Sequence, residues 1–183
     1  GKSVEDIICS LEMNGSQIIK MIRDAEIEKI QQDNSESLLN PAVLKNKFHI
    51  GVQIPVGYEY MLHKKNFIWL KKEIISGNTS LLIYQVPIKQ LTKSADIVGN
   101  IVKMRDSIGR YIKGREPNTQ MITGEAYAPY FSTIILDGKK TFESKGTWEL
   151  RNDFMTGPFI NYAIVDEAYN RILVIEGFCY SPS

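Results

Sequence analysis

The sequence predicts an α+β fold: a twisted antiparallel β-sheet of about seven to nine strands, with helices packed on one face. Hydrophobic residues recur at helical spacing near the N-terminus and again in residues 93–113. In residues 48–92 and 119–182 they alternate with polar residues, as they do in half-buried strands. Turn residues separate consecutive alternating runs, which favours antiparallel neighbours and a C-terminal meander.

Length and composition are those of one globular domain. The chain has 183 residues, of which 43% are hydrophobic and 23% charged. This ordinary balance excludes the disordered and fibrous classes. We therefore expect a single α+β domain over residues 1–183. Its parts are a helical segment (1–47), strands (48–92), a helix (93–113) and an antiparallel meander (119–182).

Two helices are predicted at the start of the chain. Ser3 followed by Asp6 is close to a capping box, so a first helix should cover residues 3–12. Asn14-Gly15 should end or interrupt it, because glycine is the usual C-terminal stop. A second helix, with an apolar stripe and a charged outer face, is predicted over residues 16–32.

The hydrophobic period changes to two in the middle of the chain. Polar residues 31–37 are typical of a linker or a frayed helix end, and Asn40-Pro41 begins a short helix that reaches about residue 47. Residues 49–54 then alternate and predict a strand. Residues 58–62 and 67–74 predict a hairpin.

A central strand and one long helix follow. Residues 81–86 are apolar on both faces apart from Gln85, as expected for a strand with neighbours on both sides. Ser94 is expected to cap a helix that runs to about Ile112. Its apolar stripe consists of Ile97, Ile101, Met104, Ile108 and Tyr111. Arg105 and Asp106 lie outside this stripe and are a candidate buried or interfacial ion pair.

The C-terminal third predicts a meander. Residues 120–127 are expected to pair with 130–136. Asp137-Gly138 is the strongest hairpin signal in the chain, because a type I′ turn needs positive φ at both central residues. In the return strand 141–150, one face carries Phe142, Ser144, Gly146, Trp148 and Leu150, and the other carries Glu143, Lys145, Glu149 and Arg151. A final hairpin covers 159–180.

Several classes of function lack support in the sequence. No metal site is expected, since His49 and His63 lack ligand spacing, and no cofactor-binding glycine motif is present. Residues 61–120 are rich in Lys and Arg, yet aromatic residues interleave with Lys only around Trp69, so nucleic acid is not an expected partner. No apolar run is long enough for a membrane span. Cys9 and Cys179 are interpreted as small buried hydrophobes.

Carboxylates are the one remaining catalytic option. Glu125, Glu149, Asp153 and Glu176 fall in the C-terminal sheet, where a pair across a strand could act as acid and base. If the protein is an enzyme, Glu149, Asp153 and Glu125 are the residues to test. Against this, Glu149 belongs to the polar face, and Asp153 sits where its side chain would bind the backbone of a turn.

A binding role for aromatic residues is the alternative. Most aromatic residues of the strands are expected in the core, but Tyr130 and Phe154 lie in or next to bends. The segment 146–159 places aromatic residues beside an acidic, glycine-containing bend. We therefore take Tyr130, Phe154, Asn152 and Asp153 as ligand-binding candidates.

Several short motifs carry a resemblance to a known family. They are Ile54-Pro-Val-Gly-Tyr58, Asn66-Phe-Ile-Trp-Leu70, Leu82-Ile-Tyr84, Arg105-Asp-Ser107, Pro129-Tyr-Phe131, Gly146-Thr-Trp148, Asn152-Asp-Phe-Met-Thr-Gly-Pro-Phe159 and Gly177-Phe-Cys-Tyr-Ser-Pro182. Over roughly residues 15–182 the sequence resembles an uncharacterised lipoprotein family of Bacteroidetes-type bacteria, classed as a domain of unknown function.

The resemblance implies a place in the cell but no activity. It implies a lipid-anchored protein of the cell envelope, in the periplasm or at the outer membrane. The signal peptide and lipidated Cys would precede this chain, and a further helix would follow it; Cys9 is not the lipidated residue, because no apolar region precedes it. The resemblance supplies no catalytic residues. We therefore expect a non-catalytic binding or structural module for an envelope protein or glycan, with a carboxylate-dependent hydrolase of an envelope polymer as the alternative.

Overall fold

The computed structural model describes residues 3–91, 93–114 and 116–182. The chain divides into two compact units, Gly1–Val56 and Gly57–Ser183, which are described in turn. Helices α1 (Val4–Ser35) and α2 (Ala42–Phe48) belong to the first unit. The second unit contains the sheet and helix α3 (Ile97–Gly109).

Helix α1 is continuous, so the predicted break at Asn14-Gly15 is wrong. Of the two alternatives predicted for residues 31–37, the linker is wrong, whereas a helix end does lie there, at Ser35. The expected capping box is present: the Ser3 hydroxyl accepts from the Asp6 backbone N–H at 3.1 Å, and the Asp6 carboxylate accepts from the Ser3 N–H at 3.2 Å. At the expected break, Asn14 Nδ2 donates to the Ser10 carbonyl at 2.8 Å, within the helix. A glycine inside a helix costs only about 1 kcal/mol relative to alanine, too little to end a helix with good formers on both sides.

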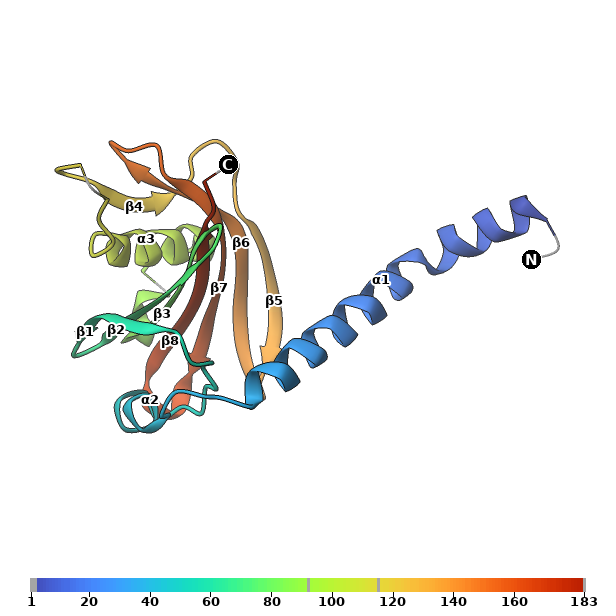
Figure 1. Ribbon diagram of the computed structural model, residues 1–183. Coiled ribbons are helices and arrows are strands. Elements are labelled where there is room, and N and C mark those ends of the chain that lie inside the picture. Colours follow the sequence, from blue (N-terminus) through green and yellow to red (C-terminus); the bar gives the residue numbers. More distant parts are fainter. Residues whose placement is uncertain (1–2, 92, 115, 183) are drawn as a thin grey trace. The chain divides into compact units, whose positions relative to one another are not determined.

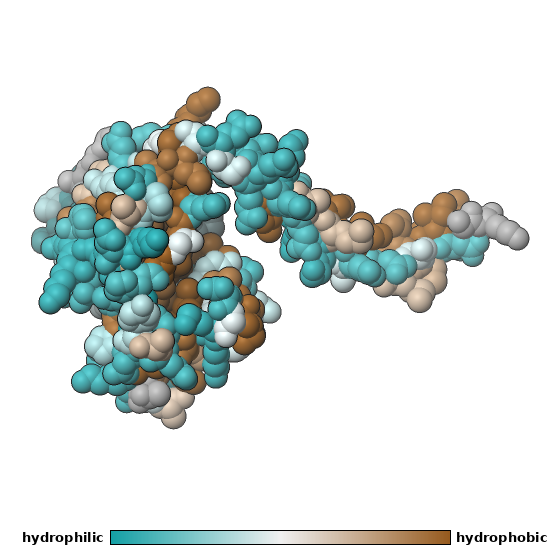
Figure 2. Space-filling model, turned by 90° about the horizontal axis from the view of Figure 1, so that it is seen from below, coloured by the Kyte–Doolittle hydropathy of each residue, from teal (hydrophilic) through white to brown (hydrophobic). Residues whose placement is uncertain are grey.

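No residue of α1 is buried, and apolar and polar side chains lie next to one another along it (Figure 2). Cys9, expected in the core, is accordingly exposed. Among the helices of residues 3–91, 93–114 and 116–182, none combines the length and the hydrophobicity that a membrane span requires.

Residues 49–54 form no strand, contrary to the alternation of their hydrophobic residues. His49 ends α2 in the left-handed conformation (φ 55°) and donates its backbone N–H to the Lys45 carbonyl. An isolated bridge joins Leu38 to Pro55. Alternation alone therefore did not produce a strand, because a strand also needs a partner along its length and Pro55 has no N–H to donate.

The second unit is built on an open antiparallel sheet with eight strands in the part of the chain that the structure describes (Figure 1). The strands are β1 (Glu59–Lys64), β2 (Phe67–Ile74), β3 (Gly77–Pro87), β4 (Gln120–Thr123), β5 (Tyr130–Leu136), β6 (Lys139–Arg151), β7 (Thr156–Asp166) and β8 (Arg171–Tyr180). Their order is β1-β2-β3-β8-β7-β6-β4, and β5 also pairs with β6. This confirms the predicted α+β class, and β3 is the predicted central strand.

The pairing expected between residues 120–127 and 130–136 is wrong. Both β4 and β5 pair with β6 instead, and they follow one another along it. Thr123 lies opposite Trp148 and Tyr130 opposite Lys145, while the Gly124 N–H donates to the Thr147 carbonyl at 2.7 Å between them. The 13-residue length of β6 allows this, because it offers edge positions to two short strands.

Helix α3 lies on one face of the sheet (Figure 1). Its N-cap is Asp96, whose carboxylate accepts from the Gly99 N–H at 2.8 Å, so the predicted cap at Ser94 is wrong; the Ser94 hydroxyl instead donates to the Asn100 side chain. The helix ends at Gly109, earlier than expected. A Cβ there would lie 1.9 Å from the Met121 carbonyl oxygen, so only glycine allows this approach to β4.

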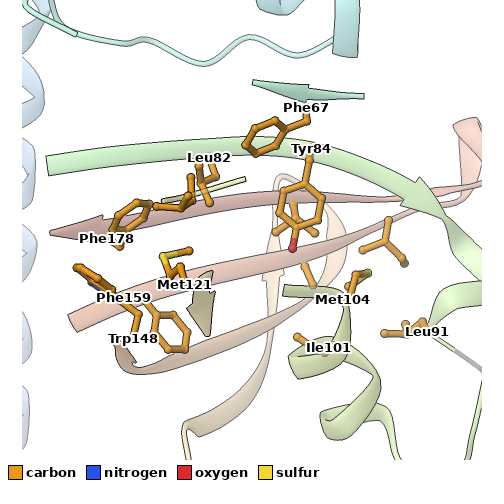
Figure 3. Close-up of a cluster of buried hydrophobic side chains, with 14 of the residues drawn as sticks. Phe67, Leu82, Tyr84, Leu91, Ile101, Met104, Met121, Trp148, Phe159 and Phe178 are labelled. Atoms are coloured by element: carbon orange, nitrogen blue, oxygen red, sulfur yellow. The ribbon is translucent and has the colours of Figure 1, made fainter. Parts of the chain in front are cut away.

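The core fills the space between the sheet and α3 (Figure 3). Trp148 and Leu150 are buried, as the alternation of β6 predicts, and they are joined by Tyr84 and Phe159. The turn before β6 has φ of 49° at Asp137 and 71° at Gly138, which confirms the positive φ values of a type I′ turn. These elements hold the β6–β7 connection at one end of the sheet.

Candidate binding site

Two groups of carboxylates lie in the second unit, and the first is a buried ion pair. Arg105 projects from α3 toward the middle of the sheet, where its Nε lies 3.1 Å from both oxygens of Glu176 and its Nη2 lies 2.9 Å from Oε1. Arg105 is 2% and Glu176 0% exposed. The guanidinium also stacks over the Phe159 ring, 3.9 Å from its centroid. Helix and sheet are therefore joined by a bidentate pair, the geometry in which arginine and carboxylate interact best.

Neighbouring polar groups complete this network. Asn161 Nδ2 donates to Glu176 Oε2 at 2.8 Å, and Arg105 Nη1 donates to the Thr123 hydroxyl at 3.0 Å. Asp106 accepts from both the backbone N–H and the hydroxyl of Thr123 at 2.8 Å. The expected pairing of Arg105 with Asp106 is present at 3.7 Å, but Glu176 is the nearer partner. Glu176, a catalytic candidate from sequence, is thus occupied by structural contacts.

Two atoms of the network have no hydrogen-bond partner among the described residues, the Tyr84 hydroxyl and the Asn161 carbonyl oxygen. Tyr84 is fully buried in the core cluster (Figure 3). Its burial, followed by the nearby Glu176 charge, raises the pKa of the Tyr84 phenol well above its usual range. The phenol therefore stays neutral in the folded protein.

The second group of carboxylates surrounds a hollow at the β6–β7 connection, named the bend pocket here. Its volume is about 510 Å³. The lining residues are Ile122, Glu125, Glu149, Leu150, Arg151, Asn152, Asp153, Phe154, Met155 and Thr156. The pocket therefore joins the end of β4 to the whole connection between β6 and β7.

The backbone of the bend is fixed by short-range contacts. Asn152 has φ of 64°, in the left-handed region that asparagine tolerates better than most residues. The Asp153 carboxylate accepts from the Phe154 N–H at 2.7 Å, which is the turn role predicted for it. The Leu150 N–H donates to the Met155 carbonyl at 2.9 Å and closes the loop. These contacts place the Phe154 side chain at the tip of the bend.

Phe154 is fully exposed, at 103% of the reference area for its residue type. By contrast, Met155 beside it is half-buried and packs against the core cluster. Keeping a phenylalanine in water forgoes about 1.5–3 kcal/mol of burial free energy. An exposed aromatic side chain on an ordered bend is available to a binding partner.

The charges of the bend pocket are mainly negative. Glu125 is exposed, Glu149 and Asp153 are half-buried, and Arg151 supplies one positive charge. Among the described residues, no side chain donates a hydrogen bond to Glu125 or Glu149. Their oxygens are therefore able to accept hydrogen bonds from a ligand.

A second hollow of about 360 Å³ continues from the bend pocket. The two share Ile122, Glu125 and Arg151, and the second is also lined by Tyr127, which is exposed, and by Pro129. Together they form a surface that passes along β4 and the segment after it. Such a surface suits an elongated ligand better than a compact one.

The structure brings most of the predicted site residues together. Five of the six, listed as they occur in the chain, line the bend pocket: Glu125, Glu149, Asn152, Asp153 and Phe154. Tyr130 is exposed, as expected, but it begins β5 opposite Lys145 and does not line this pocket. Sequence reasoning missed Arg151 as a lining residue, although its place on the polar face of β6 was the available signal.

An open antiparallel sheet with one covering helix and a pocket at a hairpin end defines an α+β domain. The chain belongs to the family described as domain of unknown function DUF4837, whose model matches residues 37–183. The match begins after α1, later than the expected likeness from residue 15. No curated protein matches the chain.

Proposed function

We propose that this domain is a non-catalytic binding module of the cell envelope that holds a glycan in the bend pocket. The observation that carries the proposal is the fully exposed Phe154 ring, held by an ordered turn at the rim of a pocket in which no described side chain donates to Glu125 or Glu149. Binding sites combine an apolar surface with a few oriented polar groups, and this pocket has both.

The chemistry of the pocket favours a glycan. A sugar presents an apolar face of C–H groups, which can lie on an aromatic ring, and hydroxyl groups, which can donate to carboxylates. Phe154 supplies the ring, and Glu125 and Glu149 supply acceptor oxygens. The continuation past Tyr127 would accommodate further units of a polymer. An envelope protein is the other partner that the sequence leads us to consider.

The place of action is proposed on the resemblance alone. The motifs from Ile54-Pro-Val-Gly-Tyr58 to Gly177-Phe-Cys-Tyr-Ser-Pro182 resemble envelope lipoproteins. An N-terminal lipid anchor would hold the domain at the membrane surface, in the periplasm or at the outer membrane. A glycan polymer of the envelope would then lie within reach of the bend pocket.

A glycan array tests the binding proposal. The array should carry fragments of bacterial envelope polysaccharides and peptidoglycan, and it should be probed with the wild-type chain and with Phe154→Ser. We expect the wild type to bind a subset of the glycans and Phe154→Ser to lose that binding. Tyr169→Ser is the matched control, because Tyr169 is an exposed aromatic residue at the β7–β8 turn, the opposite end of the sheet.

The proposal fails if the wild type binds no glycan, or if Phe154→Ser and Tyr169→Ser reduce binding equally. If the array is negative and Phe154→Ser abolishes capture of an envelope protein, the pocket serves a protein partner instead. Melting temperatures of both variants must equal that of the wild type. A fall for Phe154→Ser alone would show that the ring contributes to packing.

One observation favours a second function, a carboxylate-dependent hydrolase of an envelope polymer. Glu125, Glu149 and Asp153 line the same pocket. However, Asp153 already accepts the Phe154 N–H, and Glu125 is exposed to solvent. Release of reducing ends from the polymer, lost in Glu149→Gln, would establish the hydrolase and displace the binding module.

A further inference from the structure

The two free edges of the sheet differ in how well they are protected against pairing with a strand of another chain. Strand β1, at one edge, carries Glu59, His63 and Lys64, and its register with β2 is interrupted by a bulge between Tyr60 and Leu62. Charges and bulges are the features by which natural sheets prevent pairing with other chains. The β1 edge is therefore protected.

Strand β5, on the other side of the sheet, has none of these features. Its sequence, Tyr-Phe-Ser-Thr-Ile-Ile-Leu, contains no charged residue, no proline and no bulge in its register with β6. Within the described part of the chain it pairs with β6 alone, so its outer backbone N–H and C=O groups face away from the sheet. Ile135 is 71% exposed. An uncharged, regular, apolar edge strand is a template for adding another strand.

We propose that β5 pairs with β5 of a second copy of this chain, antiparallel and about a two-fold axis at Thr133. This register uses the whole strand. On the face that also carries α3, it sets Phe131 opposite Ile135 of the second copy and Thr133 opposite its own equivalent. On the other face it sets Tyr130 opposite Leu136 and Ser132 opposite Ile134. Aromatic residues opposite aliphatic ones and paired threonines are favourable cross-strand combinations.

A second copy fits this edge better than an unrelated strand for two reasons. The strand is largely self-complementary, since reversing it places Phe131 opposite Ile135 and Tyr130 opposite Leu136, with Thr133 at the axis. It has no charge that its own equivalent would repel. The contact is isologous, so it closes as a dimer and does not extend into a filament. The dimer would carry one continuous antiparallel sheet across the axis.

The dimer should dissociate on dilution. A pair of seven-residue strands buries less than the roughly 1,200 Å² at which stable interfaces begin. Sedimentation velocity over a wide concentration range measures this association with the full chain. We expect the wild type to shift from the monomer mass of 20.8 kDa toward twice that mass as concentration rises.

Ile135→Lys is the test variant, because lysine on an edge strand blocks pairing and the exposed position tolerates it. We expect at least a tenfold weaker association, corresponding to about 1.4 kcal/mol. Met61→Lys is the matched control: Met61 lies on the protected edge β1 and is 48% exposed. It should associate as the wild type does.

The proposal is overturned if the wild type stays monomeric throughout, or if Ile135→Lys and Met61→Lys associate equally well. Helix α1 offers the competing surface, because its apolar residues, including Leu11 and Ile18, are exposed. If Ile18→Lys abolishes association while Ile135→Lys leaves it unchanged, the helix and not the β5 edge joins the copies. Circular dichroism of each variant confirms that it is folded.

Discussion

Carboxylates occupy two contrasting environments in this protein, the helix–sheet interface and the bend pocket. Glu176 is completely buried, and Arg105 and Asn161 satisfy its oxygens. In the bend pocket, Glu149 is half-buried and Glu125 exposed, and no described side chain donates to either. The difference shows that a strand glutamate indicates function only when its face is known. A buried, satisfied carboxylate holds structure together, whereas an unpartnered one at a pocket is available to a ligand.

The largest effect should follow from breaking the buried pair. Arg105→Met leaves Glu176 charged and unpaired in the core, so we expect the free energy of unfolding to fall by about 3–5 kcal/mol in urea denaturation. Arg151→Met, at the bend pocket, is the control and should change it by less than about 0.5 kcal/mol. The double variant Arg105→Met with Glu176→Leu should regain much of the loss, because it removes the unpaired charge. If Arg105→Met and Arg151→Met lowered the free energy of unfolding equally, the buried pair would be no more important for stability than the bend pocket.

Asp166 is a second buried carboxylate, and it should make the stability of the protein depend on pH. Burial alone would raise the pKa of Asp166, but hydrogen bonds from Lys139 and Arg171 outweigh it and hold that pKa below its usual value. A lowered pKa in the folded state contributes stability that is present above the unfolded pKa of about 3.9 and lost as pH falls through the folded pKa. Asp166→Asn should cost about 2 kcal/mol at pH 7 by removing hydrogen bonds between charged groups.

Denaturation at several pH values checks this prediction. The difference in stability between wild type and Asp166→Asn should shrink as the pH falls from the unfolded pKa through the lower folded pKa of Asp166, because below the folded pKa both proteins carry a neutral group at this position. A constant difference at every pH would show that Asp166 acts through packing and not through its charge.

A smaller effect on stability is expected from the Tyr84 phenol, which lies near the buried Arg105–Glu176 pair. Tyr84→Phe removes a buried hydroxyl for which the described residues supply no partner of good hydrogen-bond geometry, so stability should rise by about 1 kcal/mol, the desolvation cost recovered. Thermal and urea denaturation measure the change. A loss of similar size would indicate that the hydroxyl is satisfied in solution, for example by a water molecule shared with Asn161.

The smallest effect on stability is expected in the bend pocket itself. Phe154→Ser and Glu149→Gln should each change the free energy of unfolding by less than about 0.5 kcal/mol, since neither removes buried contacts. The same variants are the ones expected to weaken ligand binding. If either variant were destabilised by more than about 2 kcal/mol, the side chain would have a structural role and would no longer be a candidate for ligand binding.

Local chemistry was readable from the sequence. The Asp137-Gly138 turn needs positive φ at two adjacent residues, and this requirement does not depend on the rest of the fold. The alternation of β6 placed Trp148 inside, and the position of Phe154 in a bend marked it as exposed. The candidate site was predictable to the same extent: residues close together in sequence reached one pocket, whereas Tyr130 did not.

The sequence by itself thus determined the α+β class, the Asp137-Gly138 turn and the buried face of β6, because these depend on backbone preferences and on spacing over a few residues. Tertiary structure decided that β4 and β5 share β6, that Arg105 pairs with Glu176 and that residues 49–54 form no strand. Each of these depends on a partner far along the chain or on the absence of one. Periodicity describes one segment at a time, and it carries no information about which segment will lie opposite.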